Sequence, residues 1–198
     1  MLNTIFEDEY LLVLAKPPGQ TVNISQTTKR QKTLQDELED YFGIKNSAEG
    51  IGGRAGIVHR LDKETSGILV VAKSQGAFEN LQAQFKERKT EKEYRALVHG
   101  KTSPEGKIEA PLGRIGAFGG KFGVIAGGRE AQTSFKTEKY YQREGEVFSF
   151  LAVHPLTGRT HQIRVHLKHI GYPVVSDPLY LSSNRLKEDL KFCPRLFL

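Results

Sequence analysis

The segment that constrains this chain most is His59–Gly67, with the sequence His-Arg-Leu-Asp-Lys-Glu-Thr-Ser-Gly, which leads directly into the apolar run Ile68–Ala72. A short apolar run with β-branched residues, bounded by a glycine, predicts a buried strand. The carboxylate of Asp62 therefore lies among cations and hydroxyl groups where a strand begins. In isolation, Arg-x-Asp is most often a surface salt bridge or a turn, so the rest of the chain must decide whether Asp62 does chemistry.

The composition is that of a folded and basic protein. The chain has 198 residues, 38% of them hydrophobic, with 11 Phe and 7 Tyr, and its formal net charge is +6. A net positive charge favours a polyanionic partner, either nucleic acid or an anionic membrane surface. The single cysteine, Cys193, cannot close an intrachain disulfide, which suits a reducing compartment.

No targeting or membrane segment is expected. Glu7, Asp8 and Glu9 stand where a signal peptide would carry cations. The longest apolar runs, Leu11–Ala15 and Ile68–Ala72, are far shorter than the ~20 residues that span a bilayer. We expect a cytoplasmic protein.

In the first half of the chain, local patterns predict a strand over 10–15 and two helices. The strand is stopped by Lys16-Pro17-Pro18-Gly19, a stiff turn that aims Lys16 beyond the strand end. One helix begins at the cap Thr33 and ends at Gly43, with Leu34, Leu38 and Phe42 on one face. The other begins at the cap Ser74 and runs to about Lys89, with a buried stripe formed by Phe78, Leu81 and Phe85.

In the second half, strands predominate. Alternation predicts a strand over 92–100 and a hairpin of two strands, 131–141 and 146–153. Between them, the glycine-rich and basic residues 101–128 indicate a mobile loop or hairpin, or else a plain flexible connection. A helix capped by Thr160 and ended by Gly171 follows, then a short helical segment over 185–190. Because no linker or repeat is visible, we expect a single catalytic domain over 1–198.

Several kinds of site fit the sequence poorly. His161, His166 and His169 cluster, but no acid lies between them and the spacing is not that of a zinc site. Asp62–Gly67 is weakly similar to the Asp-Lys-Thr-Gly-Thr of phosphate-transferring ATPases, yet a residue is inserted and no Walker-type glycine loop is present. Ser66 lacks the Gly-x-Ser-x-Gly context of a nucleophilic serine.

The remaining chemistry is that of an ionised carboxylate held by guanidinium groups. With an ordinary pKa of ~3.9, Asp62 is a poor base near neutral pH but a permanently charged nucleophile. A carboxylate that faces a polyanion weakens binding. On a protein surface that binds nucleic acid, a catalytic role therefore explains Asp62 better than a binding role does. Arg164, in a predicted helix, is the candidate to hold Asp62 by a charge-assisted pair.

Several motifs occur in a fixed order that resembles the RluA-type pseudouridine synthase family. They are Lys16-Pro17-Pro18-Gly19, His59–Asp62 with Thr65–Gly67, Lys92-x-Tyr94-x-Ala96-x-Val98-x-Gly100, Leu156–Leu167, Gly171-Tyr172-Pro173 and Asp177-Pro178-Leu179-Tyr180. The resemblance covers the chain from about residue 5 to its end. It implies an α+β fold built on a mixed, mainly antiparallel β-sheet with flanking helices and a central catalytic cleft.

The resemblance also implies a function: isomerisation of a uridine in ribosomal or transfer RNA to pseudouridine, without metal or cofactor. Asp62 would attack the ribose or the base, and Arg60 would fill the gap left by the flipped nucleotide. Tyr94 would stack on the extruded uracil and assist proton removal from C5. Arg164 would pair with Asp62. Extruding a base from the stack costs a few kcal/mol, and stacking and intercalation by protein side chains would offset this cost. We assign further substrate binding to Lys16, His59, Thr65, Arg159 and His161, and expect a monomer.

The sequence also departs from the family pattern. Because the motifs begin almost at Met1, we expect no S4-like RNA-binding domain before the catalytic region. This sequence stops at Arg195-Leu196-Phe197-Leu198, where a further strand is usual in the family, so we expect a truncated C-terminus. Ser176 replaces a usual glycine. Two other functions stay open, a non-catalytic RNA-binding protein on the same scaffold and a phosphoryl-transfer enzyme.

Overall fold

The computed structural model describes residues 2–24, 31–116 and 120–198, and the chain divides into two compact units, residues 1–90 and 91–198. Each unit contains its own cluster of buried apolar side chains. The sequence showed no linker at this boundary, and the prediction of a single catalytic domain stays a prediction.

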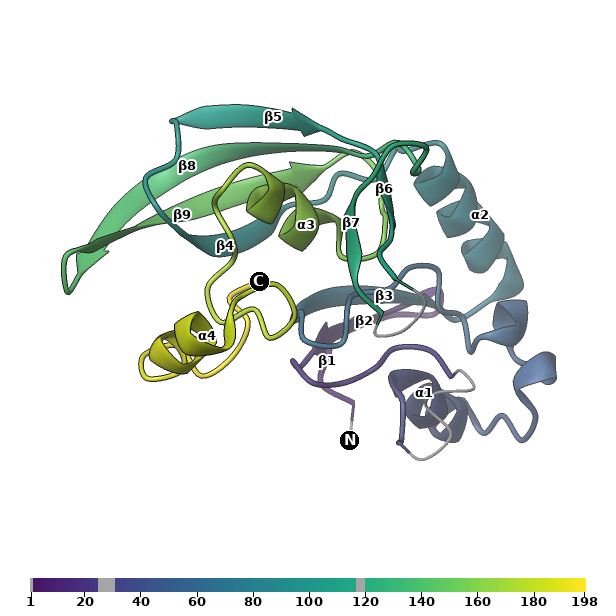
Figure 1. Cartoon of the computed structure of the whole chain (residues 1–198). Coiled ribbons are helices and arrows are strands. Elements are labelled where there is room, and N and C mark those ends of the chain that lie inside the picture. Colours follow the sequence, from purple (N-terminus) through teal and green to yellow (C-terminus); the bar gives the residue numbers. More distant parts are fainter. Residues whose placement is uncertain (1, 25–30, 117–119) are drawn as a thin grey trace. The chain divides into compact units, whose positions relative to one another are not determined.

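The first unit is built on a three-stranded antiparallel sheet in the order β1-β2-β3 (Figure 1). Its strands are β1 (Thr4–Glu7), β2 (Leu11–Lys16) and β3 (Gly67–Ala72). The central strand β2 pairs with β3 without interruption from Leu11 opposite Ala72 to Lys16 opposite Gly67. This register places Lys16 beside the start of β3, where the Asp62 segment enters the sheet. The strands predicted over 10–15 and 68–72 are confirmed.

The first helix, α1 (Leu34–Phe42), has the ends that the sequence predicted. Thr33 and Asp36 form a reciprocal capping box, and Gly43 ends the helix in the left-handed conformation, with φ at 67°. Leu34 and Leu38 from α1 pack in the same buried cluster as Leu12 from β2. Two short 3-10 turns, Ser47–Glu49 and Ile51–Gly53, precede the Asp62 segment.

The second helix, α2 (Gln75–Lys86), is capped by Ser74 as predicted but ends earlier than Lys89. It stops because Arg88 adopts a left-handed conformation, with φ at 59°, and the backbone N–H of Lys89 turns back to the Gln84 carbonyl at 2.9 Å. The predicted apolar stripe is only partly buried. Phe78 is 5% exposed, whereas Leu81 and Phe85 are half-buried.

The second unit is built on a four-stranded antiparallel sheet in the order β4-β9-β8-β5 (Figure 1). Its strands are β4 (Tyr94–His99), β9 (Glu146–Pro155), β8 (Gln132–Arg143) and β5 (Glu105–Glu109). The predicted hairpin is confirmed, with a tighter turn made by Glu144 and Gly145, both in the left-handed region. Every strand pairing among the described residues of the chain is antiparallel, which confirms the α+β class.

The glycine-rich segment 101–128 is more ordered than a flexible connection. It contains β5 and the small hairpin β6 (Leu112–Arg114) and β7 (Phe122–Val124). Gly113 and Gly123 face each other in this hairpin, and a Cβ on either would lie within 2.3 Å of an isoleucine side chain. Gly119, one of the glycines that suggested mobility, lies outside the described residues.

The helix α3 (Gln162–His169) packs against β7, β8 and β9. The N-terminal cap predicted for this helix is wrong. The helix begins after His161, which has a left-handed φ of 56° and makes no side-chain capping bond, so Thr160 is not the cap. All residues from Gln162 to Leu167 are buried, rather than one face alone. The last helix, α4 (Ser183–Asp189), is capped by Ser182 and confirms the predicted helical segment near 185–190.

Ser176, at the position where the family usually has glycine, also has a left-handed φ of 56°. Its hydroxyl donates to the Cys193 carbonyl at 2.6 Å, which offsets the strain of this conformation. In the described part of the chain, no helix is long and apolar enough to cross a bilayer. The same residues contain no group of three or more His, Cys, Asp or Glu that could hold a metal ion.

Candidate active site

Asp62 lies in a loop that backbone hydrogen bonds hold just before β3. The N–H of Thr65 donates to the Asp62 carbonyl at 3.2 Å, and the N–H of Gly19 donates to the Lys63 carbonyl at 2.8 Å. Leu61 is buried and anchors the loop, whereas Asp62 is half-buried and Arg60 is exposed. The loop therefore fixes the backbone of Asp62 without enclosing the residue.

Lys16 is buried and holds this loop from the adjacent strand. Its ammonium donates to three backbone carbonyls, those of Pro17 at 2.8 Å, Gln20 at 3.0 Å and Lys63 at 3.1 Å. Burial lowers the pKa of Lys16 to about 8, although the nearby Glu64 and Asp62 carboxylates act in the opposite direction. Substrate binding by Lys16 stays a prediction, and the contacts described are structural.

His59 also has a structural contact in the same unit. Its Nε2 accepts the backbone N–H of Val70 at 2.9 Å, and its ring stacks on Phe85 with centroids 4.8 Å apart. Because Nε2 accepts, a neutral His59 carries its proton on Nδ1. The ring thus fastens the start of the Asp62 segment to β3 and α2.

Thr65 contributes a buried hydroxyl. The residue is 2% exposed, and among the described residues its Oγ1 is a buried side-chain oxygen with no hydrogen-bond partner. Leaving a buried hydroxyl unpaired costs about 1–3 kcal/mol. Thr65 and the exposed Arg60 remain predicted substrate-binding residues.

Arg164 is held by a carboxylate that the sequence analysis did not assign. Its Nε and Nη2 donate to the two oxygens of Asp177, each at 2.7 Å, and the two residues are 2% and 0% exposed. Asp177 also accepts the backbone N–H of Leu179 at 2.9 Å and of Tyr180 at 3.1 Å. A planar, bidentate pair of this kind fixes the orientation of the whole guanidinium group.

Tyr180 links Arg164 to the β6–β7 hairpin. Its ring centre lies 5.1 Å from the Arg164 guanidinium carbon. Its hydroxyl accepts the backbone N–H of Phe122 at 3.0 Å and lies 2.9 Å from Nδ1 of His161. Which of the two groups donates in the contact between His161 and Tyr180 depends on the tautomer of His161. The predicted substrate ligand His161 is therefore held beside Tyr180.

Gln162 forms the centre of a second buried network. Its Oε1 accepts from the Thr157 hydroxyl at 2.7 Å and the Arg159 backbone N–H at 2.9 Å. Its Nε2 donates to the Gln132 carbonyl at 2.8 Å and the Thr133 hydroxyl at 3.0 Å. All four hydrogen-bonding sites of the amide are used. Gln162 thus joins the start of α3 to β8 and to the preceding turn.

His166 extends this network and stays neutral. Its Nε2 lies 3.1 Å from the Ala110 carbonyl, which can only accept, so Nδ1 accepts from the Thr133 hydroxyl at 2.9 Å. Burial lowers the pKa of His166, in agreement with this tautomer. Of the three histidines that cluster in the sequence, His166 therefore uses both ring nitrogens for hydrogen bonds inside the protein.

Tyr94 and Arg159 are the other predicted site residues of the second unit. Tyr94 begins β4, is half-buried and packs against the buried cluster that contains Ala96 and Leu151. Arg159 Nε donates to the Glu130 carbonyl at 3.1 Å. Their roles toward a substrate stay predictions.

The comparison with known proteins decides the family. Residues 10–169 match the family model described as RNA pseudouridylate synthase. The chain belongs to this family. The resemblance inferred from the ordered motifs is thereby confirmed, and the matched range includes Asp62, Tyr94 and Arg164.

Relatives agree with this membership. The chain is 37% identical over 202 residues to ribosomal large subunit pseudouridine synthase D of Pseudomonas aeruginosa, covering 98% of this chain and 60% of that protein. It is 43% identical over 182 residues to an uncharacterized RNA pseudouridine synthase of Aquifex aeolicus, covering 90% of this chain and 56% of that protein. The chain thus spans less than two thirds of the length of these curated relatives.

A solved structure supports the fold. Human RNA pseudouridylate synthase domain containing 1 matches with a TM-score of 0.74 and 27% identity, covering 100% of this chain and 75% of that one.

Proposed function

We propose that this chain is an RNA pseudouridine synthase that isomerises a uridine in ribosomal or transfer RNA, with Asp62 as the nucleophile. The observation that carries the proposal is the family match, whose range contains the three residues to which we assign the chemistry, Asp62, Tyr94 and Arg164. The names of several relatives, which specify the large ribosomal subunit, favour ribosomal over transfer RNA.

The reaction breaks the bond between uracil N1 and ribose C1′ and forms a bond between C5 and C1′. A proton leaves C5 and N1 gains one, so the reaction consumes neither water nor an oxidant. The Asp62 carboxylate would attack either C1′ or the base and be released when the new bond forms. The backbone bonds around Asp62 support this role, since a nucleophile must be positioned within a few tenths of an ångström.

The other residues would serve base extrusion and positioning. Arg60 is exposed next to Asp62, as an intercalating side chain must be. The aromatic ring of Tyr94 would stack on the uracil, and the Arg164 guanidinium would pair with the Asp62 carboxylate. The bidentate contact with Asp177 supports the last role, because it orients the guanidinium group before substrate binds.

The first test replaces the nucleophile. We expect Asp62→Ala to reduce pseudouridine formation by at least about a thousandfold, equivalent to about 4 kcal/mol of activation free energy. RNA binding should remain within about twofold, because removing a negative charge does not weaken attraction to phosphate. Pseudouridine is measured by mass spectrometry of nucleosides from a large-subunit ribosomal RNA transcript.

The control is Glu64→Ala, which removes a carboxylate two residues away and should leave the rate unchanged. Pseudouridine formation by Asp62→Ala at the wild-type rate would exclude Asp62 as the nucleophile. A wild-type protein that binds RNA but forms no pseudouridine in either RNA class would favour the non-catalytic alternative.

A further inference from the structure

The outer half of the β8–β9 hairpin, which we call the arm, extends beyond its neighbouring strands and comprises residues 137–148. The ladder of β5 with β8 ends at Lys136, and the ladder of β4 with β9 ends at Phe148. Every β8 residue from Glu138 to Arg143 is exposed, so both faces of β8 are open here. The β8 side of this ribbon therefore contributes little to a core, whereas Phe148 on the β9 side is buried with Val175 and Cys193.

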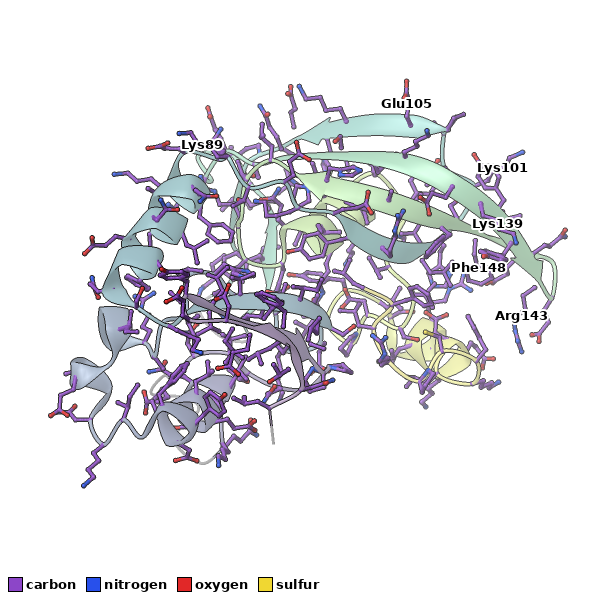
Figure 2. The ribbon with its side chains drawn as sticks, turned by 180° about the vertical axis from the view of Figure 1, so that it is seen from behind. Lys89, Lys101, Glu105, Lys139, Arg143 and Phe148 are labelled. Carbon is purple, nitrogen blue, oxygen red and sulfur yellow. The ribbon has the colours of Figure 1, made fainter. Side chains whose placement is uncertain are left out.

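Two lysine–tyrosine pairs lie at the arm, and one of the lysines, Lys101, comes from the segment between β4 and β5. Lys101 Nζ lies 5.6 Å from the ring centre of Tyr140, and Lys139 Nζ lies 5.0 Å from that of Tyr141. The tyrosines are 40% and 44% exposed and are consecutive in β8, so they point to opposite faces of the strand. Figure 2 shows Lys101 and Lys139 along the outer edge of the arm, with Arg143 near its tip.

Each acid of the arm forms an ion pair with an arginine. Glu138 pairs with Arg95, which also pairs with Glu93 at 2.8 Å. Glu146 pairs with Arg185, and Glu144 pairs with Arg143 at 2.9 Å. Within the described part of the chain, neither Lys101 nor Lys139 forms an ion pair with a carboxylate. The positive charge of these two lysines therefore faces solvent.

A purely structural explanation covers the lysines but not the tyrosines. Lysine on an exposed strand edge prevents pairing with another strand. The need to prevent strand pairing does not explain why the rings of Tyr140 and Tyr141 remain almost half-exposed. Aromatic rings next to cations, on a surface that tracks a strand, are the elements of single-stranded nucleic-acid recognition.

We propose that the arm, together with Lys101, is a second RNA-contacting element with one lysine–tyrosine pair on each face of β8. Lys101 and Lys139 would bind phosphates, and Tyr140 and Tyr141 would stack on unpaired bases outside the reacting nucleotide. The choice of RNA over an acidic protein rests on the proposed function. The Tyr140 hydroxyl donates to the Thr102 carbonyl at 2.9 Å, which holds one ring in place before RNA binds. The surface would increase affinity for RNA without taking part in the chemical step.

The test is a double charge reversal, Lys101→Glu with Lys139→Glu, measured with a labelled single-stranded oligouridine over a range of NaCl concentrations. Each lost phosphate contact lowers the slope of log K against log salt by about 0.7 for a single strand, so we expect a decrease of about 1.4. The Kd should rise at least about tenfold. With a large-subunit ribosomal RNA transcript, KM should rise while kcat stays unchanged.

The matched control is Lys45→Glu with Lys187→Glu, which changes the net charge equally at two exposed lysines outside the arm. If the arm variant and this control weaken binding equally, or if neither alters the slope, the arm is not an RNA-contacting surface. An acidic protein partner would give the same negative result.

A second pair of variants tests the rings. Tyr141→Ala should weaken oligouridine binding at least about fivefold, whereas Tyr141→Phe, which keeps the ring, should not. Duplex RNA should be bound equally by both, since its bases are not free to stack. The binding measurements do not depend on isomerisation, so their failure is distinguishable from failure of the proposed function.

Discussion

At the scale of single residues, the proposed site depends on a contact that spans 13 positions of the chain. The buried Arg164 guanidinium pairs with the carboxylate of Asp177. Their contact depends on how the segment after α3 folds back. For the same reason, Lys16 and His59 could be selected from motifs, but their backbone partners at Lys63 and Val70 could not.

Asp177→Asn provides the prediction at this scale. The substitution keeps the shape but removes the charge that faces a buried guanidinium, and breaking such a pair costs about 3–5 kcal/mol of unfolding free energy. If the pair also orients Arg164 for the reaction, kcat should fall at least about tenfold at temperatures where the variant is folded. Urea unfolding and the rate of pseudouridine formation measure the two effects separately.

The control is Asp189→Asn, since Asp189 is equally buried and accepts from His99 at 2.9 Å and the Ser176 backbone at 2.8 Å. The Asp189→Asn variant should be less stable than the wild type, but its kcat should be unchanged at temperatures where it is folded. Equal losses of kcat in the two variants would mean that Asp177 supports the fold alone.

At the scale of elements, the ends that were predicted correctly are those set by neighbouring residues. The cap Thr33 and the left-handed Gly43 that bound α1 need only local sequence. The turn between β8 and β9 was expected over residues 142–145 and is shorter, with Glu144 and Gly145 alone between the paired Arg143 and Glu146. The start of α3 was predicted wrongly because its geometry is set from a distance. Gln162 bonds to the Gln132 carbonyl and the Thr133 hydroxyl on β8, and this tertiary contact replaces a cap at Thr160.

Gln162→Met tests how strongly this amide fixes α3. The thioether keeps the length of the side chain but leaves the Arg159 N–H and the Gln132 carbonyl without their bonds. We expect a loss of about 2–4 kcal/mol in the free energy of unfolding. The same substitution at the exposed Gln142 should change stability by less than about 0.5 kcal/mol. Equal unfolding midpoints for the two variants would contradict the central role of Gln162.

At the scale of the whole molecule, the net charge of +6 can be counted from the sequence, but the environment of each charge cannot. Most lysines lie on the surface, whereas Lys16 is 2% exposed, and only the strand register explains why. A strand-terminal lysine looks the same in sequence whether its ammonium faces solvent or three carbonyls. The effect of such a buried charge appears in the pH dependence of global stability.

Lys16→Met isolates this effect. The folded pKa of Lys16 is about 8, below its ordinary value of 10.5, so between these pH values the unfolded chain binds the proton that the folded chain has released. The unfolding free energy of the wild type relative to Lys16→Met should therefore rise from pH 8 to pH 10.5, by about 2–3 kcal/mol. The titration of the other lysines is common to both proteins and cancels. The three carbonyl bonds oppose this trend because they need all three N–H groups of the ammonium. A relative stability that falls over this range, measured by urea unfolding, would mean that these bonds outweigh the cost of burial.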